Sequence, residues 1–208
     1  DHRGWPLVRT HHRAPVMPRG KGLSVDTVAP LSSARAPAVA LAGAMVLAAS
    51  VGIGRFAYTP LLPAMQETFG WTMPQAGDVA SANFLGYTVG ALAAAALAQR
   101  LACRYWLLMG MILSATTTAA GAVVIGVPLW AGLRFCSGVA SALCLVLGTA
   151  MVLGCLHSTT RTPLGALHFS GVGGGIVVSV VSIECVRRVG WSMGSQWAAL
   201  GCIAAILC

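Results

Sequence analysis

The stretch APAVALAGAMVLAASVGIG, residues 36–54, runs for 19 positions without a charged side chain. A helix of about 20 apolar residues crosses the ~30 Å hydrocarbon core of a bilayer, so this run has the length of a membrane span. The rest of the chain has the same character, because 57% of its 208 residues are hydrophobic and 9% are charged. A soluble domain carries about 25% charged residues. The composition therefore predicts an integral membrane protein in contact with the lipid bilayer.

Five further apolar segments follow the first one along the chain. We place the six at 37–65, 77–98, 105–125, 129–156, 163–186 and from 192 onward, the last being cut off at residue 208. Lipid offers no partner to open backbone groups, and these runs do not alternate as barrel strands do. The predicted fold class is an all-α membrane protein, with a disordered basic tail at 1–35 and a six-helix transmembrane bundle at 36–208.

The net charge of +8 would fit a nucleic-acid-binding protein, but the positions of the basic residues argue against that partner. Six of the 13 lie before the first apolar run. With the N-terminus in the cytoplasm, Arg100, Arg104 and Arg161 join those six on the inner side, and only Arg187 and Arg188 lie outside. Cytoplasmic loops of membrane proteins carry such an excess of Lys and Arg. We therefore expect a multi-pass protein with a cytoplasmic N-terminus and no nucleic acid.

The seven cysteines do not predict a metal site or a cofactor. They form no CxxC pair, their number is odd, and nearly all lie inside apolar segments, where a free cysteine behaves as a small hydrophobic residue.

Four strings of the chain resemble a known family. Gly54, Pro60 and Pro63 follow the first-helix motif of the major facilitator superfamily. More narrowly, the chain is similar to the YbfB/YjiJ-type branch of that superfamily in the strings GRFAYTPLLP, GDVASANFLGYTVGAL, RFCSGVASALCLVL and LHFSGVGGGI. The resemblance implies twelve helices in two six-helix bundles, of which this chain would supply the first, with the C-terminal bundle missing. It also implies a proton-coupled secondary transporter of a small solute in the bacterial cytoplasmic (inner) membrane.

Two other motifs of the superfamily are present in part. Arg134, Ser137 and Gly138 meet its fourth-helix pattern, and Arg100 and Arg104 keep the basic positions of its loop between the second and third helices. The aspartate and glycines of that loop motif are absent, which puts an aspartate-based cytoplasmic latch in doubt. The two arginines remain available to helix ends or lipid phosphate.

Ionisable residues inside a bilayer are costly, at least ~2.5–3.5 kcal/mol each on insertion scales, so each needs a reason. Arg55, Asp78 and Arg134 fall in the outer half of their spans. We expect them to share one layer, with the two arginines carrying substrate or proton coupling and Asp78 as their counter-ion. The alternative is a structural ion network that fixes helix packing.

Two more ionisable residues lie in the fifth span. His168 is near its cytoplasmic end and is either a proton relay or an interfacial side chain. Glu184 lies three and four residues before Arg187 and Arg188, a spacing that predicts helical ion pairs with a structural role.

Glycine and proline positions indicate where helices bend or approach closely. We expect Gly54, Pro60 and Pro63 to kink the first span, and Gly171 and Gly175 to provide close packing in the fifth, where Gly173 and Gly174 are further candidates. Small residues also recur every four positions in the second span, at 82, 86, 90, 94 and 98. Such faces let helix backbones come together in lipid.

Two other function classes were weighed against a transporter. An intramembrane serine protease lacks support, because its GxSG motif is absent and the side chains of His168 and Ser170 point about 200° apart on one helix. We therefore do not expect an enzyme. A non-transporting membrane subunit that binds a partner through its small-residue faces remains the alternative function.

Overall fold

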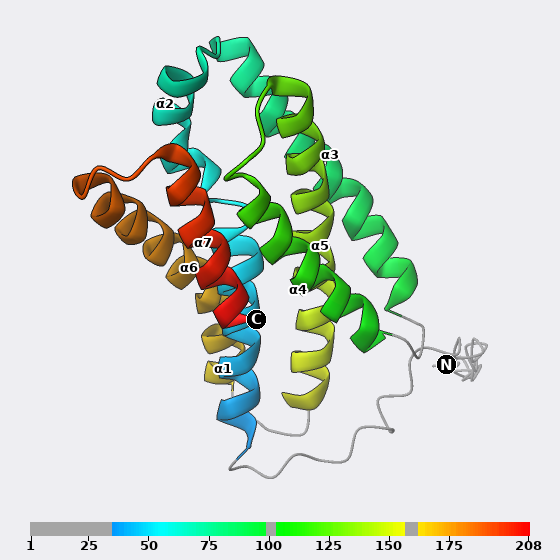
Figure 1. Ribbon diagram of the computed structural model, residues 1–208. Coiled ribbons are helices and arrows are strands. Elements are labelled where there is room, and N and C mark those ends of the chain that lie inside the picture. Colours follow the sequence, from blue (N-terminus) through cyan, green and yellow to red (C-terminus); the bar gives the residue numbers. More distant parts are fainter. Residues whose placement is uncertain (1–34, 99–102, 157–161) are drawn as a thin grey trace, which may run out of the picture.

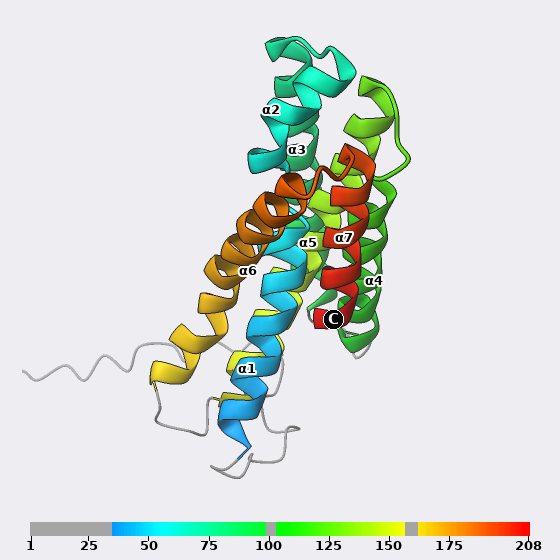
Figure 2. The same ribbon diagram turned by 60° about the vertical axis from the view of Figure 1, so that its left-hand side comes forward.

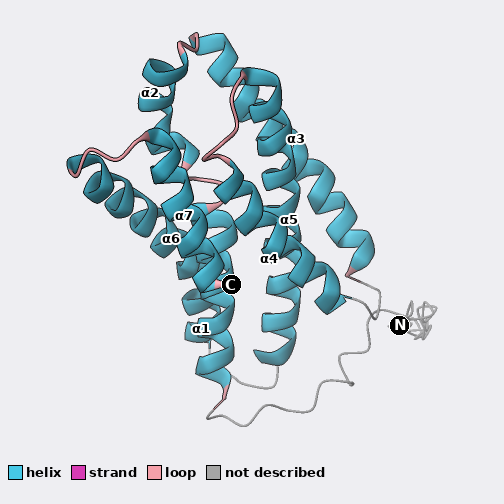
Figure 3. Cartoon of the chain, viewed as in Figure 1, coloured by secondary structure: helices cyan, strands magenta, loops and turns pink. Residues whose placement is uncertain are grey.

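The chain is described by a computed structural model over residues 35–98, 103–156 and 162–208. Every regular element in these ranges is a helix, as Figure 3 shows, and this confirms the all-α prediction. The elements are α1 (Ala36–Leu47), η2 (Ala48–Ile53), α2 (Tyr58–Phe69), α3 (Met73–Leu97), α4 (Cys103–Ala120), α5 (Val127–Leu156), α6 (Thr162–Arg188) and α7 (Met193–Leu207). The tail predicted to be disordered lies outside these ranges except for Arg35, and Arg100 and Arg161 also lie outside them.

Four helical stretches in the described ranges are long and apolar enough to cross a membrane: Ala36–Phe69, Met73–Leu97, Val127–Leu156 and Pro163–Arg188. The apolar helix Met193–Leu207 is shorter, and α4 has 18 residues. The protein is thus a multi-pass membrane protein, while length and composition support four of the six predicted spans directly.

Helices that are distant in sequence pack side by side in the bundle. α5 lies against both α3 and α4, α6 lies along α1 and η2, and α7 packs on α4, as Figures 1 and 2 show from two directions. The contact between α3 and α5 depends on glycine from both sides. A Cβ at Gly86 would meet the backbone of Phe135, and one at Gly138 would meet the backbone carbonyl of Asn83. Close backbone approach is the device that membrane helices use where lipid supplies no hydrophobic drive.

The contact of α6 with α1 and the start of η2 uses only two of the four glycines in the GVGGG stretch. A Cβ at Gly171 would collide with the backbone of Ala44, and one at Gly175 with the backbone of Ala48. Gly173 and Gly174 have open space at the same position, so they take no part in this contact. The periodicity of a helix explains the difference, because residues four apart share a face and their neighbours do not.

The first span is not a continuous α-helix. After α1 the chain widens into the π-helical turn η2, where the N–H of Gly54 bonds to the carbonyl of Ala49 at 2.9 Å. Residues 54–57 then form turns before α2 begins at Tyr58. Pro60 accounts for a break here, since it has no N–H to donate and its ring crowds the carbonyl of residue 56. That carbonyl accepts instead from the N–H of Thr59 at 3.2 Å.

An aromatic cluster closes the end of the bundle at which α2 and α3 meet. Trp130 is fully buried, and its ring centroid lies 6.0 Å from that of Trp71 and 5.2 Å from that of Trp197. The link between α2 and α3 turns at Gly70, whose φ is +66°. Thr72 then caps α3 by accepting from the N–H of Gln75. The ring contacts and the helix cap therefore stabilise this end of the bundle.

Candidate functional site

The break at residues 54–57 leaves backbone carbonyls that side chains of α5 satisfy. The Arg134 guanidinium donates from Nη1 to the carbonyl of Gly54 at 2.9 Å and from Nη2 to the carbonyl of Arg55 at 2.6 Å. The hydroxyl of Ser137 donates to the Gly54 carbonyl as well, at 2.9 Å. Open backbone inside a membrane protein must find such partners within the protein. Arg134 and Ser137 of the fourth-helix motif thus stabilise the first span where it is not α-helical.

Arg134 is deeply buried, with 3% of its surface exposed. Its guanidinium lies 5.1 Å from the centroid of the Tyr58 ring, and its Nε has no hydrogen-bond partner among the described residues. Tyr58 is fixed in turn by its hydroxyl, which donates to the carbonyl of Ala76 at 3.0 Å. Asn83 anchors the α5 backbone by donating to the carbonyl of Arg134 at 2.8 Å.

Arg55 lies at the break itself and extends over the aromatic side chains of α3. Its guanidinium carbon is 4.1 Å from the centroid of the Tyr87 ring, 5.0 Å from that of Phe84 and 5.7 Å from that of Phe56. A cation over aromatic faces is attracted by their quadrupoles, more strongly where water is excluded.

Both arginines line one small cavity between the first span, α3 and α5. Its volume is about 70 Å³, and its walls are Arg55, Phe56, Tyr58, Thr59, Ala80, Asn83, Phe84 and Arg134. The structure therefore brings Arg55 and Arg134 into one layer, as the depths of these residues in their spans predict. We call this space the arginine cavity.

The counter-ion pairing predicted for Asp78 is not formed. Asp78 is exposed on α3, and over the described ranges the ion pairs within 4 Å are those of Glu184 with Arg187 and Arg188. The buried face of α3 passes through Val79 and Asn83, and one helical residue turns the side chain by about 100° away from that face. Its direction around the helix therefore separates Asp78 from the arginines.

Comparison with known protein families identifies the chain. Residues 37–208 match the family described as uncharacterised MFS-type transporter YbfB. The chain belongs to this family of the major facilitator superfamily. Comparison with curated proteins and with solved structures found no match. The YbfB-type assignment covers every helix described above apart from the first residue of α1, and it confirms the resemblance seen in the four sequence strings.

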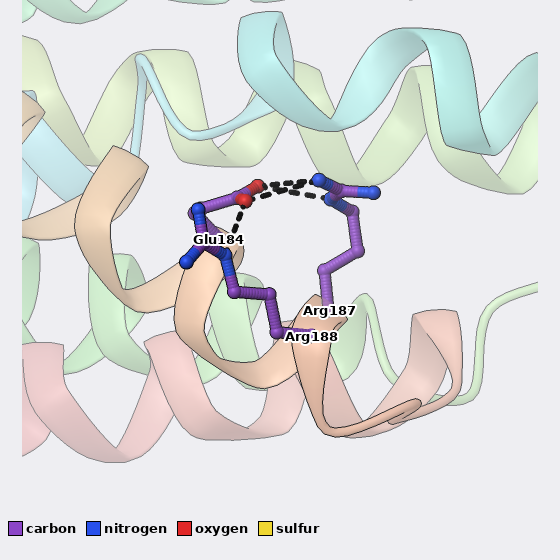
Figure 4. A network of polar contacts seen from close by, with 3 residues as sticks. All are labelled: Glu184, Arg187 and Arg188. Atoms are coloured by element: carbon purple, nitrogen blue, oxygen red, sulfur yellow. Dashed lines mark hydrogen bonds and ion pairs between the residues drawn. The ribbon is translucent and has the colours of Figure 1, made fainter.

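The ion pairs that the sequence of this YbfB-type transporter predicts at the end of α6 are present. Glu184 accepts from Arg187 Nη2 at 2.8 Å and from Arg188 Nε at 2.8 Å, as Figure 4 shows. Arg187 and Arg188 are exposed at the end of α6, and Glu184 is partly exposed. A surface ion pair of this kind contributes little to stability, and none of its residues lines the arginine cavity. The prediction that Glu184 is structural agrees with this geometry.

His168 lies in a separate polar site between α6, α5 and α1. Its side chain is fully buried, its Nε2 is 3.1 Å from the hydroxyl of Thr149, and its Nδ1 has no partner among the described residues. A Cβ at Gly43 would meet this imidazole. The imidazole is therefore packed between three helices of the bundle. His168 also does not line the arginine cavity.

The remaining predicted loop residue, Arg104, is exposed at the start of α4, where its Nη2 donates to the hydroxyl of Tyr105 at 3.4 Å. No group of three potential metal ligands occurs in the described part of the chain. Sequence reasoning missed Tyr58 and Phe84 as walls of the site. Tyr58 stands within the first-helix motif, but only the tertiary contacts show that its ring packs against an arginine.

Proposed function

We propose that this chain is the N-terminal six-helix bundle of a proton-coupled secondary transporter that carries a small solute across the bacterial cytoplasmic membrane. Its family match over residues 37–208 supports transport. The six-span count treats α1, η2 and α2 as one broken span and includes the shorter helices α4 and α7. A second bundle completes the transporter, as in the superfamily that the chain resembles.

The observation that carries this proposal is the broken first span held by Arg134 and Ser137. Transporters place solute sites near the bilayer midplane where helices are interrupted, because unwound backbone and charged side chains can then face a ligand. In this chain the interruption, two arginines and a cavity coincide. The tight glycine contact of α6 with α1 would let these helices move as one body while the two bundles rock.

The roles in this proposal divide between two sites. Arg55 and Arg134 face the solute, and His168 accepts the coupling proton. The buried imidazole with an unpartnered Nδ1 supports the second role, since histidine exchanges a proton near neutral pH. We assign no role to Asp78, which is exposed and outside the arginine cavity.

The proposal is tested with the full-length protein in liposomes that contain the pH dye pyranine. A panel of amino acids, sugars and carboxylic acids is added outside, and the internal pH is followed. We expect at least one solute to acidify the lumen in liposomes with the protein and not in empty ones. A panel that produces neither a pH change nor solute uptake would favour the non-transporting subunit.

His168→Gln then separates proton coupling from solute movement. We expect the variant to lose uphill uptake driven by a pH gradient but to retain exchange of labelled for unlabelled solute, which needs no net proton movement. Arg104→Gln, which changes an exposed side chain of α4, is the control and should retain both activities. Loss of exchange by His168→Gln in a protein of normal stability would assign His168 to solute binding instead.

A further inference from the structure

We infer that the arginine cavity binds the carboxylate of a small organic anion, and that this anion carries a planar apolar body. This inference rests on the proposed transport function for its biological meaning, although the binding itself can be measured without transport. It specifies the substrate class, which the family description leaves open.

The charge around the cavity favours an anionic ligand. Arg55 and Arg134 line the same cavity, and neither forms an ion pair with an acidic side chain in the described ranges. A buried cation without a counter-ion is expensive, and proteins compensate for it by pairing. Two positive charges around one cavity therefore favour an anion inside it.

The cavity also has hydrogen-bond donors that the protein leaves unused. A guanidinium has five N–H groups, and Arg134 uses two of them on the carbonyls of Gly54 and Arg55. Its Nε has no hydrogen-bond partner among the described residues, although only 3% of the residue's surface is exposed. A carboxylate matches the planar fork of arginine and accepts two hydrogen bonds from it, so it is the anionic group that fits these donors best.

The size of the cavity limits the chemical group that it can hold. The cavity volume of about 70 Å³ accommodates a group of a few heavy atoms, given that a water molecule occupies about 30 Å³ of liquid. A carboxylate therefore fits, and the remainder of the molecule must extend outside the cavity.

The aromatic side chains around Arg55 indicate what that remainder is. Phe56 and Phe84 line the cavity and are 38% and 63% exposed, and the Tyr87 ring lies under the Arg55 guanidinium. Rings at the mouth of a polar cavity favour a flat apolar body, which can stack on them in offset or edge-to-face geometry. Benzoate is the simplest probe that combines both features.

Equilibrium dialysis of labelled benzoate against the full-length protein in detergent tests the inference. We expect saturable benzoate binding, no saturable binding of the neutral isostere benzamide, and at least about tenfold weaker benzoate binding by Arg55→Gln, because a charge-assisted pair is lost. Arg55→Lys keeps the positive charge but lacks the planar pair of N–H donors. Its affinity for benzoate should therefore lie between that of the unchanged protein and that of Arg55→Gln. Phe84→Ala should weaken the binding of benzoate more than that of acetate.

Arg188→Gln is the matched control, because it removes an exposed arginine that is paired with Glu184 and does not line the cavity. It should bind benzoate as the unchanged protein does. Equal binding of benzoate and benzamide, absence of saturable benzoate binding, or unchanged affinity in Arg55→Gln would each overturn the inference. If an acidic side chain from another segment of the protein occupies the cavity, saturable benzoate binding will be absent.

The failures of this inference and of the proposed function have different signatures. Benzoate binding without transport of any solute leaves the anion site in place and removes the transporter. Transport that is fully retained in Arg55→Gln, or that is confined to neutral solutes, keeps the transporter and removes the anion site.

Discussion

Arg134 illustrates how one side chain can be both structural and available to a ligand. Two of its N–H groups stabilise the carbonyls of the broken first span, and its Nε has no protein partner in the described ranges. The sequence predicted an ion network around this residue. The structure replaces the expected carboxylate with the backbone carbonyls of Gly54 and Arg55, which carry partial negative charge.

The dual role makes a prediction for stability. Arg134→Ala should lower the free energy of unfolding by about 2 kcal/mol, because the Arg55 carbonyl loses its partner in a dry environment and the Gly54 carbonyl keeps only Ser137. Ser137→Ala should cost about 1 kcal/mol, since the Gly54 carbonyl keeps its bond from Arg134. Unfolding in mixed micelles of increasing SDS content measures both. Arg188→Ala, an exposed control, should be nearly neutral, and equal stabilities for all three variants would contradict the structural role of Arg134.

At the scale of elements, the first span and α6 depend on each other. A Cβ at Gly52 would meet the backbone of Gly175, so the π-helical turn η2 can lie against α6 only because both positions lack a side chain. The widened turn is common at functional sites of membrane and soluble helices. Here it directly precedes the turns that carry Arg55.

Two neighbouring glycines of α6 provide a matched test of this contact. Gly171→Ala should destabilise the protein by about 1–3 kcal/mol, because the new methyl group would collide with the backbone of Ala44 in a packed interface. Gly173→Ala has open space and should be neutral or stabilising by up to ~1 kcal/mol, the helix-propensity difference between the residues. Unfolding in mixed micelles compares the two. Equal losses in both variants would show that α6 does not pack on α1 in this register.

At the scale of the molecule, the helices enclose only part of their apolar surface. Large apolar side chains of α3 and α6 away from the arginine cavity, including Leu92, Val177 and Val181, are exposed. In a membrane protein such surface faces lipid or another helical bundle, so its exposure here is consistent with the multi-pass assignment.

The proposed orientation predicts which ends of the helices are accessible from each side. In a cysteine-free full-length protein, Arg188→Cys should react with a membrane-impermeant maleimide added to intact spheroplasts, because the end of α6 is proposed to face outward. Arg104→Cys, at the start of α4, should react only after the membrane is permeabilised. Both positions lie close to helix ends in the structure. The reverse pattern would show that the N-terminus is outside and that the distribution of basic residues misleads in this chain.

Sequence patterns predicted the site in part. Depth along each span correctly placed Arg55 and Arg134 in one layer, because rise per residue is constant in a helix. The same argument failed for Asp78, since its direction around α3 depends on which face of that helix packs against α5. Spacing sufficed for Glu184, Arg187 and Arg188 because their contacts are local to one helix.

The sequence by itself determined that this chain is helical, that it belongs in a membrane and that it is a YbfB-type transporter, because solvent preference and family strings are properties of contiguous residues. Only the tertiary structure decided that Arg134 binds the carbonyls of residues 54 and 55, that Asp78 stands apart, and that Gly171 and Gly175 meet α1 while Gly173 does not. The physical reason is that these contacts join segments that lie about 80 or more residues apart in the chain. The rotation and approach of whole helices set such contacts, and no local pattern encodes them.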